Sequence, residues 1–198
     1  MQELAPGPPC RGAGLLRGFP PTVVPAGLVI ETPESAHEIS VPPNRVALVI
    51  ATGAGAGYAP VAPGTFGSAL GLVLYPLLAG LGPWLYALTL LALLSLGIWA
   101  ADEAERVFRR KDDGRIVIDE IAGQLLALAP LVAFGMAASL GWLVTGFVAF
   151  RCFDIWKPGP ARWAERSFEG GAGVMLDDVV AGLFAAVVLS GAAIAVGT

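Results

Sequence analysis

The chain has 198 residues, of which 56% are hydrophobic and only 14% are charged, against roughly 25% charged residues in an ordinary soluble domain. This composition argues against a free-standing soluble enzyme, and a net charge of −4 without a dominant basic cluster argues against a nucleic-acid partner. The two cysteines, Cys10 and Cys152, are too far apart in sequence to indicate a disulfide scaffold, and the single histidine, His37, makes histidine-dependent catalysis improbable.

The first 44 residues are rich in proline and glycine and lack a sustained hydrophobic period. Such a segment cannot bury enough apolar surface to offset the entropy lost on ordering. Pro20, Pro21 and Pro25 interrupt the only stretch that resembles the apolar region of a signal peptide. We therefore predict a disordered extension over residues 1–44 and one helical domain over residues 45–198.

Three blocks contain no charged residue: residues 46–101, 121–150 and 179–198. A helix that spans the hydrocarbon core needs about 20 apolar residues. The last block fits one such helix, and the first is long enough for two, divided near Gly80 and Pro83. Soluble cores seldom avoid charge for so long, because some faces must meet water. We predict an all-α fold, a compact bundle of membrane-associated helices.

Two charged segments, residues 102–120 and 151–178, separate the blocks, and both carry several Lys and Arg residues. Both are therefore expected on the cytoplasmic side of the membrane. If so, residues 121–150 cannot form a single span, and as a hairpin each arm is about 20 Å long, too short for a core of about 30 Å. Pro130 and Gly135 favour a bend in the middle. We predict a shallow or re-entrant hairpin that brings the two charged segments together.

Acidic residues stand at the edges of the blocks: Asp119 and Glu120, Asp154, and Asp177 and Asp178. A carboxylate beside a long apolar helix is costly unless it is paired, bound to metal or at the interface. Mg²⁺ binds through hard oxygen ligands such as these together with substrate phosphate. The alternative is helix capping, which explains one acid at each helix start more readily than two.

Arg151, Asp154 and Lys157 are spaced so that they share one helical face, with Lys157 in the last turn before Pro158. Arg forks onto phosphate oxygens, Lys supplies a point charge and Asp can hold a cation, so the trio suits a phosphate–metal site. An exposed ion pair of little energetic consequence is the simpler alternative for this spacing.

Two glycine-rich stretches complete the polar pattern. Residues 52–68 are not a dinucleotide-binding fingerprint, because Tyr58 replaces a required glycine and Pro60 interrupts the helix. This stretch can instead offer backbone N–H groups and the hydroxyls of Thr65 and Ser68 to an anion at a helix start. In the second stretch, residues 170–173, glycine permits close approach of two backbones.

Four segments in order, residues 51–68, 118–123, 150–158 and 170–182, resemble phosphatidylglycerophosphatase A, a family of bacterial membrane lipid phosphatases. The resemblance implies Mg²⁺-dependent hydrolysis of phosphatidylglycerophosphate to phosphatidylglycerol and phosphate at the cytoplasmic face of the inner membrane. The chain's partners would then be the phospholipid substrate and the bilayer. Another head-group enzyme such as a transferase would need a nucleotide site, and none is visible. A non-enzymatic membrane protein such as a transporter would usually place polar residues in the middle of a span.

The resemblance carries the family's acidic and basic motif positions over to Asp119, Glu120, Arg151, Asp154, Lys157, Asp177 and Asp178. The expected roles combine these positions with the chemistry of the residues themselves. The expected catalytic residues are Asp154, Arg151, Lys157 and Glu120. The expected metal ligands are Asp119, Asp154, Asp177 and Asp178. Substrate contacts are expected from Gly64, Thr65, Ser68, Arg151 and Lys157. The nucleophile is either water activated by the metal or a carboxylate, in which case Asp154 is the candidate because two cations flank it.

Overall fold

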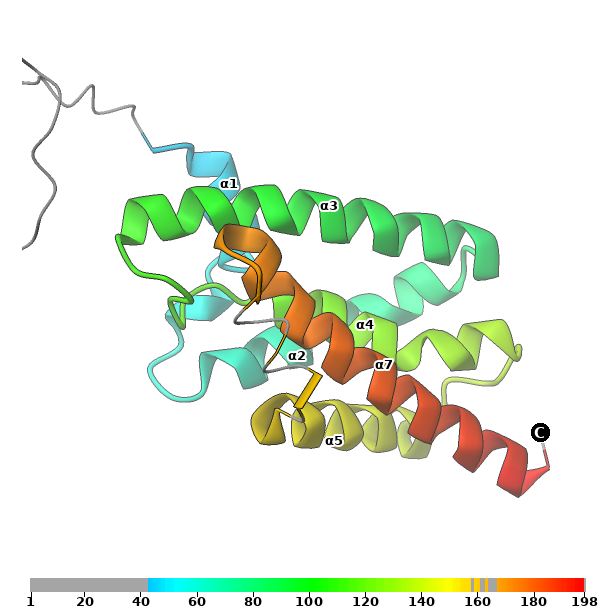
Figure 1. Cartoon of the computed structure of the whole chain (residues 1–198). Helices are drawn as coiled ribbons and strands as arrows, with labels where there is room; N and C mark the ends of the chain where they lie inside the picture. The colour runs from blue at the N-terminus through cyan, green and yellow to red at the C-terminus, as the bar shows by residue number, and fades with distance from the viewer. Residues whose placement is uncertain (1–42, 158, 161–162, 164–166, 198) are drawn as a thin grey trace, which may run out of the picture. The chain divides into compact units, whose positions relative to one another are not determined.

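A computed structural model describes residues 43–157, 159–160, 163 and 167–197 (Figure 1). The predicted N-terminal extension, residues 1–44, lies outside the described residues except for Pro43 and Asn44. The side chain of Asn44 accepts hydrogen bonds from the backbone N–H groups of Val46 and Ala47 and so caps the first helix. The description that follows concerns residues 41–198, which form one compact unit.

The described residues form helices and contain no β-strand, which confirms the all-α prediction. In chain order the helices are α1 (Arg45–Ala51), the short 3₁₀ helix η1 (Ala56–Tyr58), α2 (Pro63–Ala79), α3 (Pro83–Phe108), α4 (Ile118–Ala133), α5 (Leu140–Trp156) and α7 (Gly170–Val196).

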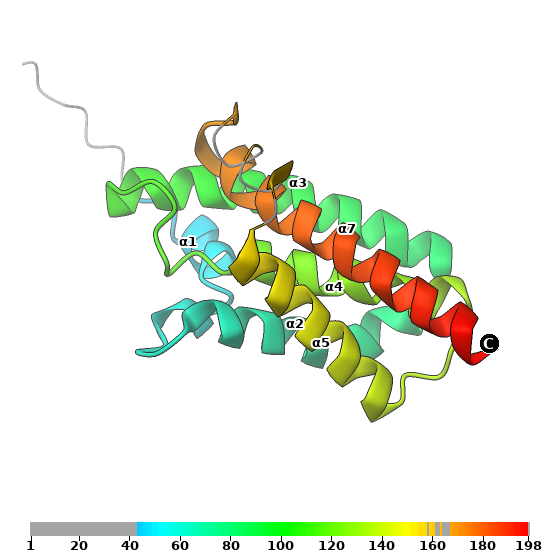
Figure 2. The same cartoon turned by 60° about the horizontal axis from the view of Figure 1, so that its bottom comes forward.

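Helix α4 lies at the centre of the bundle and packs against α2, α3, α5 and α7 (Figures 1 and 2). Leu125, Leu128 and Leu131 are fully buried, and Phe150 of α5 is buried beside them. A helix covered on every side has no face for water, and this explains why residues 121–133 carry no charge.

Helices α3 and α7 are long and apolar enough to cross a membrane, with 26 and 27 residues. Both expose large apolar side chains, including Trp84 on α3 and Val187 on α7. Extended apolar surface of this kind suits lipid better than water, and it indicates membrane association.

The predicted division of the first block is confirmed: α2 ends at Ala79 and α3 begins at Pro83. Between them Gly82 adopts a φ of 78°, and Pro83 occupies the first helical position, where its missing N–H costs nothing. The second block forms a hairpin, as predicted. Its turn follows Ala133 and uses Gly135 at a φ of 63°, whereas Pro130 remains inside α4.

Helices α4 and α7 cross at a pair of glycines. A Cβ atom on Gly182 would lie 2.7 Å from the carbonyl oxygen of Gly123, so the backbones touch where a side chain would separate them. Asp119 and Asp178 each precede the crossing by one helical turn, and both helices run in the same direction from the same end of the bundle (Figure 1). The crossing therefore fixes where these two carboxylates meet.

Candidate active site

The charged segments meet at one end of the bundle, where α3 and α5 end and α2, α4 and α7 begin (Figures 1 and 2). The backbone N–H of Gly171 donates a 2.6 Å hydrogen bond to Asp102 Oδ1, so the end of α3 caps the start of α7. This contact joins the first charged segment to the second. The two charged segments therefore meet, as expected from the predicted hairpin.

Three carboxylates form the centre of this polar end: Asp119, Glu120 and Asp178. Each offers one oxygen, and these oxygens lie within 4.8 Å of one another, a spacing that can hold a metal ion. Asp119 and Asp178 are buried, with 7% and 3% of their surfaces exposed. Among the described residues, one oxygen of each acid has no hydrogen-bond partner: Asp119 Oδ1, Glu120 Oε2 and Asp178 Oδ2.

Burial raises the pKa of Asp119 well above its ordinary value, and the neighbouring charges of Glu120 and Asp178 raise it further. Burial also raises the pKa of Glu120. Three acids in one buried site are costly when ionised, because each loses hydration and repels the others. A divalent cation removes that cost, and carboxylate oxygens are ligands that Mg²⁺ accepts. The donor set therefore fits a hard divalent cation.

Helix capping fails as an explanation for two of the predicted acids. Helix α7 begins at Gly170, so Asp177 and Asp178 lie about two turns inside it rather than in its first turn. Asp119 and Glu120 do lie in the first turn of α4. Their burial against a third carboxylate, however, is a poor arrangement for a cap, which works best where water also reaches the helix end.

Arg151 connects the carboxylates to α2. Its Nη1 forms an ion pair with Asp154 one turn later on α5 and donates a 3.4 Å hydrogen bond to Ser68 Oγ. The Asp154 carboxylate also lies near that of Asp178. The buried Nε of Arg151 has no hydrogen-bond partner among the described residues, so an N–H group remains for an anion.

Lys157 differs from its predicted position. Helix α5 ends at Trp156, because a proline disfavours helical backbone in the residue before it. Lys157 follows the helix with a φ of 44°. Its Nζ donates a 2.7 Å hydrogen bond to Asp177 Oδ2. The pair links the end of α5 to α7. Asp177, a predicted metal ligand, is thus held by a lysine, whereas Glu120, a predicted catalytic acid, joins the cluster that can hold a metal.

The start of α2 covers the site. A Cβ atom on Gly64 would collide with Glu120 Oε1 and would lie 3.2 Å from Arg151 Nη1, so a larger residue here would displace these two side chains. Ser68 is fully buried, and its Oγ donates a hydrogen bond to the carbonyl of Gly64. Thr65 lies half-buried in the same turn. Gly64 and Ser68 therefore position Glu120 and Arg151, a role the sequence analysis did not anticipate.

Two residues of this region escaped the sequence analysis. Asp102 caps α7 from another helix, a contact without a local sequence signal. Gln124 is fully buried one turn after Glu120, and neither polar atom of its side chain has a hydrogen-bond partner among the described residues. The spacing of four residues from Glu120 was the one available signal for Gln124.

Comparison with known proteins identifies the family. Residues 49–193 match the family described as Phosphatidylglycerophosphatase A. The chain belongs to this family. The matched region contains every residue of the site described above, and the predicted resemblance is confirmed.

The relatives agree with this assignment. Phosphatidylglycerophosphatase A of Escherichia coli strain K12 is 37% identical over 142 residues, which cover 71% of this chain and 80% of the relative. Phosphatidylglycerophosphatase A of Haemophilus influenzae is 34% identical over 142 residues, with 71% and 85% covered. A Bacteroides thetaiotaomicron protein provisionally named a phosphatidylinositol-3-phosphatase is 36% identical over 154 residues, with 75% and 94% covered. No solved structure matches the chain.

Proposed function

We propose that this chain hydrolyses phosphatidylglycerophosphate to phosphatidylglycerol and phosphate at a divalent-cation site formed by Asp119, Glu120 and Asp178. The family match supplies the activity: the chain is a phosphatidylglycerophosphatase. The observation that supports this location is the presence of three buried carboxylate oxygens without partners beside a buried Arg151 Nε without a partner, among the described residues. Acids that attract a cation and an arginine that attracts an anion suit a metal-dependent phosphate site.

A Mg²⁺ ion held by Asp119, Glu120 and Asp178 would neutralise phosphate charge and polarise the phosphorus–oxygen bonds. Arg151 donates from Nε and its terminal nitrogens to the phosphate oxygens, and Ser68 and Asp154 hold its guanidinium in place. Lys157 adds positive charge at the end of α5 while it fixes α5 to α7 through Asp177. Thr65 lies at the start of α2, which covers Glu120 and Arg151, and it completes the predicted substrate contacts.

Two routes of hydrolysis are open, and they differ in whether Asp154 attacks the phosphate. In one, water attacks phosphorus, the bond to the glycerol oxygen breaks, and that oxygen leaves with a proton. In the other, the Asp154 carboxylate attacks phosphorus, the bond to the glycerol oxygen breaks and that oxygen leaves with a proton; water then attacks the aspartyl phosphate, releasing phosphate and restoring the carboxylate. Acid quenching of the enzyme with radiolabelled substrate distinguishes them, since only the second route leaves label on the protein.

The placement in the membrane follows from charge. Among the described residues, the charged segments at the end of the bundle carry Arg106, Arg109, Arg110, Lys111, Arg115, Arg151 and Lys157. We place this end at the cytoplasmic face of a bacterial inner membrane, with α3 and α7 spanning it and α2 and the α4–α5 hairpin entering it only in part. Residues 45–198 then form the catalytic domain. A Cys introduced at Arg110 should react with impermeant reagents only from the cytoplasmic side.

The proposal is tested by phosphate release in detergent micelles. Purified protein should release phosphate from phosphatidylglycerophosphate with Mg²⁺, and EDTA should abolish the release. Phosphatidylinositol 3-phosphate, presented under the same conditions, tests the activity named for the Bacteroides relative. Release from phosphatidylinositol 3-phosphate alone would replace the proposed substrate, and release that is indifferent to EDTA would contradict the metal site.

A further inference from the structure

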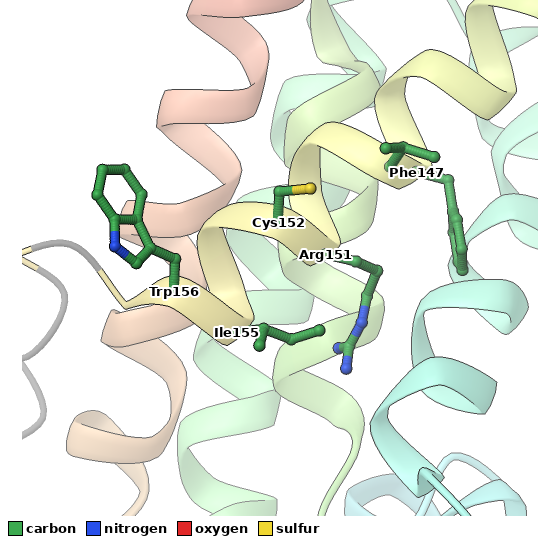
Figure 3. Close-up of a pocket in the computed structure, with 6 residues that line it drawn as sticks. Phe147, Arg151, Cys152, Ile155 and Trp156 are labelled. Carbon is green, nitrogen blue, oxygen red and sulfur yellow. The ribbon is translucent and has the colours of Figure 1, made fainter.

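A shallow, open hollow of about 830 Å³ lies along the outer face of α5, and all of its lining residues belong to this helix. It is lined by Phe147, Val148, Arg151, Cys152, Ile155 and Trp156. Figure 3 shows the small Cys152 side chain between Trp156 on one side and Phe147 on the other, with Arg151 projecting from the same helix. The hollow therefore lies over a small residue flanked by large ones.

Apart from Arg151 the lining is apolar and open to the outside. Ile155 is 74% exposed, Trp156 68% and Val148 52%. The lining extends from residue 147 to residue 156, about 13 Å along a helix that rises about 1.5 Å per residue. This length is close to half of a hydrocarbon core of about 30 Å, the depth available to one acyl chain in one leaflet.

Arg151 belongs to the hollow and to the candidate active site. Its guanidinium pairs with Asp154 and reaches Ser68, and Arg151 is also one of the residues that line the hollow. The cation thus lies at the junction of an apolar surface and a cluster that suits phosphate and metal. An occupant that matches both parts has a hydrocarbon chain joined to an anionic phosphate head.

We propose that this hollow binds one acyl chain of the lipid phosphate substrate, so that the lipid approaches from the side of α5 with its phosphate beside Arg151. The inference rests on the proposed function, because it takes the phosphate site to be the place of reaction. It adds that the enzyme recognises its substrate by the chain as well as by the head group, at Val148, Ile155 and Trp156.

The first test compares two substrates with the same head group, dioleoyl and dihexanoyl phosphatidylglycerophosphate. Replacing Ile155 by Asn should raise KM for the dioleoyl substrate about tenfold and leave KM for the dihexanoyl substrate within about twofold, because only the long chain loses apolar contact. Ile194→Asn on α7 is the matched control, since Ile194 is 70% exposed and lies outside the hollow. This control should change neither value.

An equal change for both substrates, no change, or the same change from Ile194→Asn would overturn the proposal. If the unaltered enzyme hydrolyses neither substrate, the proposed function fails instead. A measurement of lipid binding then tests whether the hollow holds an acyl chain.

Cys152 provides that binding measurement, because it is exposed within the hollow. In a Cys10→Ser background with EDTA, dioleoyl phosphatidylglycerophosphate at about ten times its Kd should slow alkylation of Cys152 by N-ethylmaleimide about tenfold. Dioleoyl phosphatidylcholine has the same chains without the terminal phosphate and should give little protection. Equal protection by both lipids would show that the hollow holds bulk bilayer lipid, and an absence of protection would show that no lipid binds there; either result overturns the proposal.

Discussion

Two buried acidic sites occupy the same end of this bundle and differ in how their charge is balanced. Asp113 accepts hydrogen bonds of 2.7 and 2.9 Å from the guanidinium of Arg115, which also stacks 3.7 Å from the ring centroid of Phe108. Asp119 shares its site with Glu120 and Asp178, and each of these acids has a buried oxygen without a partner among the described residues.

The two carboxylates expose similarly little surface, since Asp113 is 6% exposed and Asp119 is 7% exposed. They differ in that Asp113 is paired with Arg115, whereas Asp119 lies deeper in the bundle among other acids. Hydrogen bonding from Arg115 lowers the pKa of Asp113, whereas burial and neighbouring acids raise that of Asp119. The fold completes the first site by itself, so we interpret it as structural. We propose that a cation from outside completes the second site, as a metal-dependent reaction requires.

The largest expected effect concerns Asp119. Asp119→Asn should lower kcat at least about a hundredfold at millimolar Mg²⁺, since even residues that only support metal ligands commonly contribute 10–100-fold. In EDTA the same variant should unfold at an equal or higher temperature than the unaltered protein, because a buried charge has been removed. Phosphate-release kinetics and thermal unfolding check the two parts. A loss of activity that merely follows a loss of stability would make Asp119 structural, like Asp113.

The next effect concerns Arg151. Arg151→Lys keeps the charge but loses the planar fork, so kcat should fall about ten- to a hundredfold, the range of one or two lost hydrogen bonds to a charged group. The control is Arg106→Lys, because Arg106 forms an exposed ion pair with Glu103 on α3. It should leave turnover unchanged. Normal turnover in Arg151→Lys would mean that Arg151 serves only its ion pair with Asp154.

Mg²⁺ should also stabilise the folded protein. A ligand that binds only the folded state at about one hundred times its Kd adds about 2.7 kcal/mol to the free energy of unfolding. We expect the melting temperature in detergent to rise with Mg²⁺ for the unaltered protein and for Asp113→Asn. For Asp178→Asn it should stay constant, and a rise as large as in the unaltered protein would locate the cation elsewhere.

The smallest effect belongs to the structural site. Asp113→Asn should lower the free energy of unfolding by about 1 kcal/mol or less, because Arg115 is partly exposed and solvent weakens the pair. The lowered pKa of Asp113 gives the sign: its contribution is present above the unfolded value of about 3.9 and is lost as pH falls through the lower folded value. Denaturant melts between neutral and acidic pH should therefore differ from the unaltered protein above pH 4 and converge below it.

The sequence predicted those features that depend on composition and local spacing. The break at Gly82 and Pro83 and the α4–α5 hairpin followed from the lengths of the charge-free blocks and from turn residues. Doubled acids at the block edges indicated the site, because two adjacent carboxylates beside apolar helices are costly unless a cation or another partner stabilises them.

The remaining features depend on contacts between distant segments. Glu120 joins the candidate metal cluster because α4 and α7 cross at Gly123 and Gly182. The spacing of residues within either helix does not predict where the two helices cross. Lys157 pairs with Asp177 because α5 ends one residue earlier than expected and its backbone then turns. Sequence reasoning found the residues of the site, but tertiary packing decides which of them face one another.

The central claim is that Asp119, Glu120 and Asp178 together hold a divalent cation, and direct binding of Mn²⁺ as a spectroscopic substitute for Mg²⁺ tests it. Electron paramagnetic resonance of the detergent-solubilised protein should show one bound ion per chain, displaced by excess Mg²⁺. Asp113→Asn should bind it equally well, and Asp178→Asn should bind it at least about tenfold more weakly. Unchanged binding in Asp178→Asn, or equal weakening in Asp113→Asn, would contradict the account.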